Sequence, residues 1–147
     1  MLKSLAALFD APSEDRPGDQ QRLHLAAAIL LYEVAKSDHQ LDEVELQRLE
    51  SVLRAQWQLD DQALSELMAV AGREADLSAS LHEQVDVINA GFGRQQKYDL
   101  LLGLWQVACS DGEIHHYEEH LVRRIADLLY VSHSEFIRAK HEALGER

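Results

Sequence analysis

Apolar residues in this chain recur at spacings of three and four rather than two, which predicts helices throughout. These spacings predict a short N-terminal helix, a break at about 12–19, and then helices over about 19–36, 42–56, 60–74, 94–109, 115–129 and 132–144. A further helix is expected to start at a cap on Ser78 or Ser80 and to end at about 89. Asp60 and Ser132 stand where helix caps are expected. The run LAAAILLY from Leu25 to Tyr32 is apolar nearly all round, so we expect its helix to be central.

An internal repeat relates the two halves of the chain. Residues 31–41, LYEVAKSDHQL, align with residues 104–114, LWQVACSDGEI, at a displacement of 73, and Glu45 then falls on Glu118. The flanking helices match as well, so the repeat covers about 23–56 and 96–129. We therefore expect an all-α, compact bundle of about seven to eight helices, built from two pseudo-symmetric helical-hairpin halves.

Length and charge narrow the class of protein. With 147 residues the chain makes one domain, assigned to 20–147, with residues 1–19 as a short N-terminal helix and linker. The formal charge of −12, from 14 Lys and Arg against 26 Asp and Glu, argues against nucleic acid as a partner and favours cations or basic protein partners. No apolar run approaches the ~20 residues of a membrane span. A lone cysteine, Cys109, favours a reducing compartment, so we expect a cytoplasmic protein whose oligomeric state is left open.

Each half carries the motif Ser-Asp-x-x-Φ-x-x-x-Glu, where Φ is aliphatic. Helix capping alone explains the spacing, because acidic side chains stabilise the unpaired N–H groups and the positive dipole end of a helix start. The alternative is a cation site, since the segment from Asp111 to Glu118 reproduces the second half of an EF-hand calcium loop. Val107 and Cys109 stand where the first acidic ligands of that loop belong, which disfavours an EF-hand proper.

A different oxygen-rich site remains open where the two motifs approach each other. Gathered carboxylates repel, and a divalent cation relieves that repulsion. The candidate ligands are Asp38, Asp42, Glu43, Glu45, Asp111, Glu113 and Glu118. A weaker alternative is a transition-metal site at His115, His116 and His120, of which the last two share a helix face.

No catalytic pattern supports an enzyme. The chain has no glycine-rich phosphate loop, no GxSxG and no HExxH, so we expect no catalytic residues. We expect Cys109 to be a small buried hydrophobe rather than a nucleophile. The Glu-rich stretch 42–50 is expected to be a solvated helix face. The aromatic residues at core or core-rim spacing are Tyr32, Trp57, Tyr98 and Trp105.

The doubled motif, VAKSDHQLDEVE and VACSDGEIHHYEE, resembles the tellurite-resistance TerB-like family over about residues 20–144. It is also similar to the N-terminal domain of DnaJ-like membrane co-chaperones, but the chain has no His-Pro-Asp of a J domain and no membrane span. The resemblance implies a bundle of seven or eight helices in two related halves, a role in tellurite and other chemical-stress resistance, and metal binding through the acidic motif. It carries the ligand role to Asp38, Asp42, Glu45, Asp111, Glu113 and Glu118.

The first copy departs from the family pattern, because His39 stands where glycine is usual. A turn that needs a positive φ there would be strained by histidine. Two function hypotheses follow. One is a non-enzymatic module that binds or senses a divalent metal ion; the other is an acidic protein-interaction domain, scaffold or co-chaperone-like, whose motif only caps helices.

Overall fold

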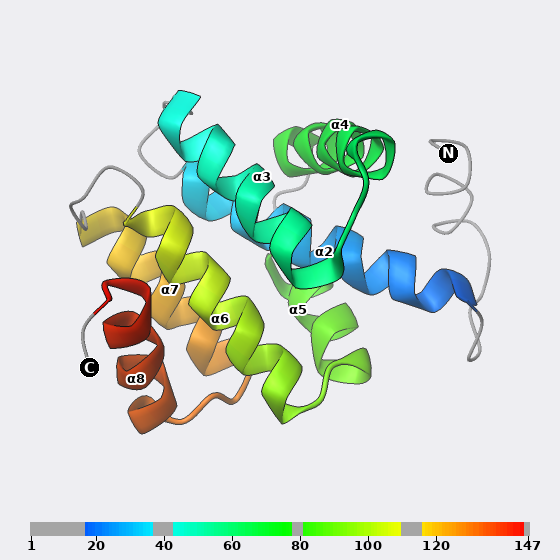
Figure 1. Ribbon diagram of the computed structural model, residues 1–147. Coiled ribbons are helices and arrows are strands. Elements are labelled where there is room, and N and C mark those ends of the chain that lie inside the picture. Colours follow the sequence, from blue (N-terminus) through cyan, green and yellow to red (C-terminus); the bar gives the residue numbers. More distant parts are fainter. Residues whose placement is uncertain (1–16, 37–42, 78–80, 110–115, 146–147) are drawn as a thin grey trace.

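The computed structural model describes residues 17–36, 43–77, 81–109 and 116–145. These residues form seven α-helices (Figure 1): α2 (Pro17–Ala35), α3 (Glu43–Trp57), α4 (Asp61–Leu77), α5 (Leu81–Gly91), α6 (Arg94–Ala108), α7 (His116–Leu128) and α8 (His133–Ala143). The all-helical compact bundle expected from the sequence is confirmed, and each boundary lies within one helical turn of its predicted place. The expected helix at the N-terminus lies outside the described residues.

Helix α2 is the centre of the bundle. It contacts α3, α4, α5, α6 and α7, and every side chain from Leu25 to Leu31 is buried. A helix that is apolar all round has no face suited to water, so burial on all sides is the arrangement that its sequence favours. The central position predicted for this helix is confirmed.

The helix contacts follow the order of the internal repeat. Helix α2 contacts α3 and α4, and its counterpart α6 contacts α7 and α8. The two sets also cross, because α3 packs on α6 and α7 packs on α2. These pairings are the ones that two hairpins packed face to face would make, although the two-fold relation itself stays a prediction.

Two helix starts are capped as the sequence predicts. The backbone N–H of Ala63 donates to Asp60 Oδ1 at 2.7 Å at the start of α4. The N–H of Glu135 donates to Ser132 Oγ at 3.2 Å at the start of α8. Each cap satisfies one of the N–H groups that a helix start leaves without an intrahelical partner.

Helix α8 is held on α6 by aromatic contacts. The rings of Trp105 and Phe136 lie 5.1 Å apart, and the Lys140 ammonium lies 5.6 Å from the Trp105 ring centroid. The Tyr98 hydroxyl donates to Glu142 Oε1 at 2.7 Å, and burial together with this bond raises the pKa of Tyr98.

Trp105 and Tyr98 are buried, whereas Tyr32 and Trp57 are half-buried at the edge of the core. The core and core-rim placement predicted for these four aromatic residues is confirmed.

His24, on α2, makes the bundle sensitive to acid. Its ring stacks on Trp57 with centroids 4.2 Å apart, and burial lowers its pKa from 6.5 to about 4. Above pH 6.5 the imidazole is neutral in the folded and unfolded states, so stability is complete. As the pH falls from 6.5 toward 4, the unfolded chain binds a proton that the folded chain does not, and stability is lost.

We therefore expect His24→Phe, which keeps a stacked ring, to remove part of the acid sensitivity. Because the imidazole is partly exposed, the wild type should lose only about 1 kcal/mol relative to the variant between pH 7.5 and pH 5.0. Urea denaturation at both pH values measures this difference. Parallel losses in the two proteins would show that His24 titrates normally.

Candidate functional site

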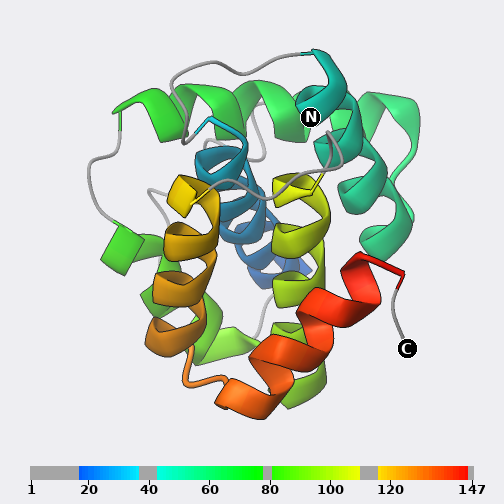
Figure 2. The same cartoon turned by 90° about the vertical axis from the view of Figure 1, so that its left-hand side faces the viewer.

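The helices that follow the two copies of the acidic motif start at the same end of the bundle. The C-terminal ends of α2 and α6 and the N-terminal ends of α3 and α7 all lie on the left of Figure 1, the side that faces the viewer in the upper half of Figure 2. Helices α3 and α7 each carry the final glutamate of the motif in their first turn. The fold therefore brings the two repeat-related helix starts to the same end of the molecule.

Glu45 and Glu118 are both buried, at 5% and 2% exposure. Each is the third residue of its helix, and each follows an apolar residue that is exposed, Val44 at 51% and Tyr117 at 69%. Both halves thus reverse the usual pattern in the same way, because the apolar side chain faces water and the carboxylate is buried in the protein. The expectation of a solvated face over 42–50 is wrong for Glu45, although Glu43 is exposed.

A buried carboxylate needs compensation, because an ionised group loses its hydration energy on burial. Both glutamates have interaction partners within the fold. The third position of a helix is also the one from which Glu or Gln reaches back to the N-terminal cap, and the helix dipole favours negative charge there. Capping and cation binding therefore both suit the positions of Glu45 and Glu118.

The other acidic candidates lie outside the described residues: Asp38, Asp42, Asp111 and Glu113. His115, from the weaker alternative, lies outside them too. Across the ranges that the structure describes, no three Asp, Glu, His or Cys side chains are close enough to hold one metal ion. The complete predicted ligand sets therefore remain predictions.

The histidine alternative has two described members, His116 and His120, and both are exposed. Between them in sequence, Glu119 lies 3.8 Å from Arg123 and 4.0 Å from Lys140, so its carboxylate ties α7 to α8. Cys109 is half-buried and packs against the core at the end of α6. The prediction of a buried cysteine is therefore correct only in part.

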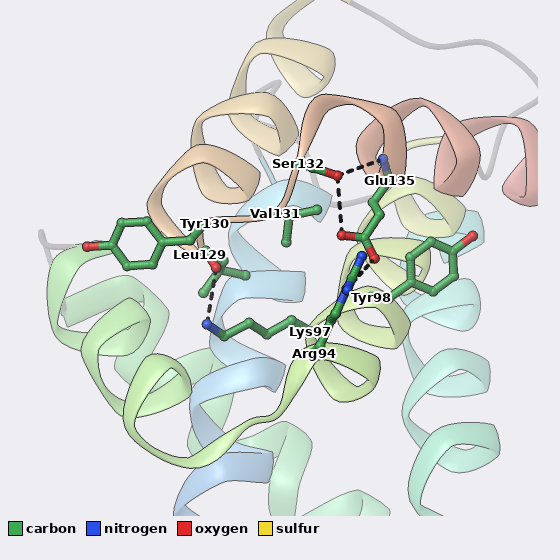
Figure 3. Close-up of a pocket in the computed structure, with 8 residues that line it drawn as sticks. All are labelled: Arg94, Lys97, Tyr98, Leu129, Tyr130, Val131, Ser132 and Glu135. Carbon is green, nitrogen blue, oxygen red and sulfur yellow. Dashed lines mark hydrogen bonds and ion pairs between the residues drawn. The ribbon is translucent and has the colours of Figure 1, made fainter.

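A pocket of about 340 Å³ lies at the opposite end of α6 and α7 (Figure 3), between the start of α6 and the turn from α7 to α8. Lys97 Nζ donates to the carbonyl of Leu129 at 3.1 Å, and Arg94 Nε lies 3.3 Å from Glu135 Oε2. The lining comprises Arg94, Lys97, Tyr98, Leu129, Tyr130, Val131, Ser132 and Glu135.

The sequence analysis missed this pocket. Its cations come from one helix and its turn from residues more than 30 positions later, so no local motif connects them. The one sequence signal lies after α7. Tyr130 follows this helix at φ 61°, in a position that glycine usually occupies. A smaller hollow of about 170 Å³ is lined by Gln56, Trp57, Phe92, Gln96 and Asp99.

These features define a small all-α bundle in which an acidic helix start occurs twice at one end. The family model described as Tellurite resistance protein TerB matches residues 24–141, which is most of the chain. The chain therefore belongs to the TerB family, as the doubled motif suggested. Searches of curated proteins and of solved structures gave no match. None of the described helices is long and apolar enough to cross a membrane.

Proposed function

We propose that this TerB-family protein is a non-enzymatic cytoplasmic module that binds or senses a divalent metal ion in a tellurite or chemical-stress response. The observation that supports this most is the pair of buried glutamates, Glu45 and Glu118, at equivalent positions of the two repeats and at one end of the bundle. Two buried carboxylates on helix starts at the same end of the bundle place negative charge there, which a cation would neutralise.

The donor atoms suggest which ions to test. Carboxylate oxygens are hard ligands that suit Ca²⁺, Mg²⁺ and Mn²⁺. In this proposal Glu45 and Glu118 supply oxygens from fixed helix starts, and the family resemblance adds Asp38, Asp42, Asp111 and Glu113. When bound, the ion would supply positive charge that joins the two repeats.

The double variant Glu45→Gln/Glu118→Gln separates cation binding from capping. Glutamine can replace glutamate at the third position of a capping box, but it removes the negative charge that a hard cation needs. We expect chelator-treated wild type to gain about 1.4 kcal/mol with free cation at ten times the dissociation constant, a rise in melting temperature of roughly 3–5 °C. The double variant should fold in chelator and show no rise.

Thermal melts with Ca²⁺, Mg²⁺, Mn²⁺, Zn²⁺ and Ni²⁺ make this test, with His116→Ala/His120→Ala as the matched control. The control should respond as the wild type does. A rise with Zn²⁺ or Ni²⁺ that disappears in the histidine variant would move the site to the histidines. No rise with any ion would leave the motif as a pair of helix caps.

The second candidate function is an acidic protein-interaction domain. Val44 and Tyr117, each exposed and each next to the final glutamate of one motif copy, favour it, because apolar side chains beside acidic ones suit a basic, amphipathic partner. In this case Tyr117→Ser should abolish a salt-sensitive association and leave any cation response unchanged. Pull-down at two salt concentrations, followed by melts of the same variant, distinguishes the two functions.

A further inference from the structure

We propose that the pocket between α6 and the α7–α8 turn binds an acidic peptide segment of a partner protein, with a carboxylate beside Lys97 and Arg94 and an apolar neighbour against Tyr130. This pocket lies where α6 begins and α7 ends, whereas Glu45 and Glu118 lie at the other end of the bundle. The proposal is therefore independent of cation binding.

The backbone at Tyr130 is the first argument. Helix α7 ends in a Schellman motif, in which the Val131 N–H donates to the Ala126 carbonyl at 3.0 Å and the Tyr130 N–H donates to the Asp127 carbonyl at 3.1 Å. This motif places Tyr130 at φ 61°, in the left-handed region that glycine adopts without a steric penalty. A bulky residue is unusual there, so something other than the turn favours the tyrosine.

The exposure of the same side chain is the second argument. Tyr130 is 83% exposed, so its ring contributes little to the core. Tyr130 lines one side of the pocket, and its ring points outward there with the Lys97 ammonium 5.8 Å from the ring centroid. A strained turn that presents an aromatic ring to solvent beside a cation is well suited to contact with a ligand.

The charge of the pocket selects the occupant. Arg94 and Lys97 bring two positive charges and Glu135 brings one negative charge, so the lining is positive by one in a chain of formal charge −12. One excess positive charge matches a single carboxylate better than a phosphate dianion. The overall negative charge opposes every anion, so only a ligand with little charge beyond that carboxylate suits the pocket.

The openness of the pocket favours a peptide over an enclosed small molecule. The Arg94 side chain is 83% exposed, as is Tyr130, so both rims lie at the surface and a chain can continue across them. The volume of about 340 Å³ is at the lower end of the range for ligand pockets, enough for one acidic side chain and part of its neighbour.

The test is an NMR titration of the full ¹⁵N-labelled chain with the capped peptide acetyl-Gly-Phe-Glu-Gly-amide. We expect shifts centred on the amides of 94–97 and 129–135, with a dissociation constant on the order of 1–10 mM for so small a probe. The matched peptide with Gln in place of Glu, and inorganic phosphate, should each bind at least several-fold more weakly. Equal binding of the Gln peptide, or tighter binding of phosphate, would overturn the assignment of a carboxylate.

Variants keep the test independent of folding. Tyr130→Gly should weaken the acidic peptide at least several-fold without lowering the melting temperature, because glycine suits the backbone at this position. Arg94→Gln should weaken it as well. Arg54→Gln, which breaks a comparable exposed ion pair of 2.6 Å with Asp61, should bind as the wild type does. Unchanged binding in Tyr130→Gly, or shifts centred elsewhere, would refute the proposal.

Discussion

Replacing Trp105 with alanine should lower the free energy of unfolding by about 3–5 kcal/mol, the loss typical of a fully buried aromatic side chain. Trp105 is 0% exposed and lies on α6, and its ring packs at a tilt of 54° against Phe136 of α8, with the ring centroids 5.1 Å apart. Its removal would leave a cavity where α8 docks and would also remove the ring beneath Lys140. Urea denaturation followed by circular dichroism measures the loss.

The matched control is Trp105→Phe. Within the described part of the chain, the Trp105 Nε1–H is buried and has no acceptor, a loss of about 1–3 kcal/mol relative to a hydrogen-bonded group. Phenylalanine removes that donor and keeps a ring against Phe136, so this variant should lose much less than the alanine variant. Equal losses would show that ring packing does not fix α8 on α6.

The substitution Gly103→Val should destabilise the bundle by about 2–3 kcal/mol, because it adds volume to a well-packed contact. Gly103 lies on α6 in close contact with α3. A Cβ atom there would lie 2.8 Å from Val52 Cγ1 and 2.9 Å from Gln56 Nε2, both on α3. Gln56 cannot simply move away, because its Nε2 donates to the Asp99 carbonyl at 2.7 Å.

A double-mutant cycle with Val52→Ala tests the cause of that loss. Truncation of Val52 removes the nearest atom, so Gly103→Val should cost about 1 kcal/mol less on that background. Chemical denaturation of the four proteins gives the coupling. Purely additive effects would show that the contact between α3 and α6 is looser than the structure has it.

The sequence predicts most of this fold because its signals are local. Asp60 and Ser132 cap helices through hydrogen bonds to residues three positions later, and sequence alone identifies such pairs. The all-round apolar run from Leu25 to Leu31 likewise has one stable solution, which is burial at the centre. Family membership also follows from a motif that occurs twice at one displacement.

The burial of Glu45 could not be predicted in the same way. Its stretch of α3 is rich in charge, and a single helix gives no sign that one of its carboxylates faces inward. The packing of α3 on α2, α4 and α6 decides that face. Only the alignment of Glu45 with Glu118 connects the two residues in the sequence. If one of them is buried, the repeat predicts that the other is buried too.

The pocket at Tyr130 illustrates a second limit. Lys97 and Leu129 are brought together by the return of α7 along α6, and the hydrogen bond that joins them is 3.1 Å long. Nothing in either local sequence specifies this partner. His116 and His120 lie one helical turn apart on α7 and are both exposed, and the histidine site stays a prediction.

The central claim is that the paired acidic motifs bind a divalent cation. Isothermal titration calorimetry of chelator-treated protein with Ca²⁺, Mg²⁺ and Mn²⁺ tests it most directly. The account predicts saturable binding by the wild type and by His116→Ala/His120→Ala, and no binding by the folded Glu45→Gln/Glu118→Gln variant. Undiminished binding by that variant, or no binding by the wild type, would contradict it.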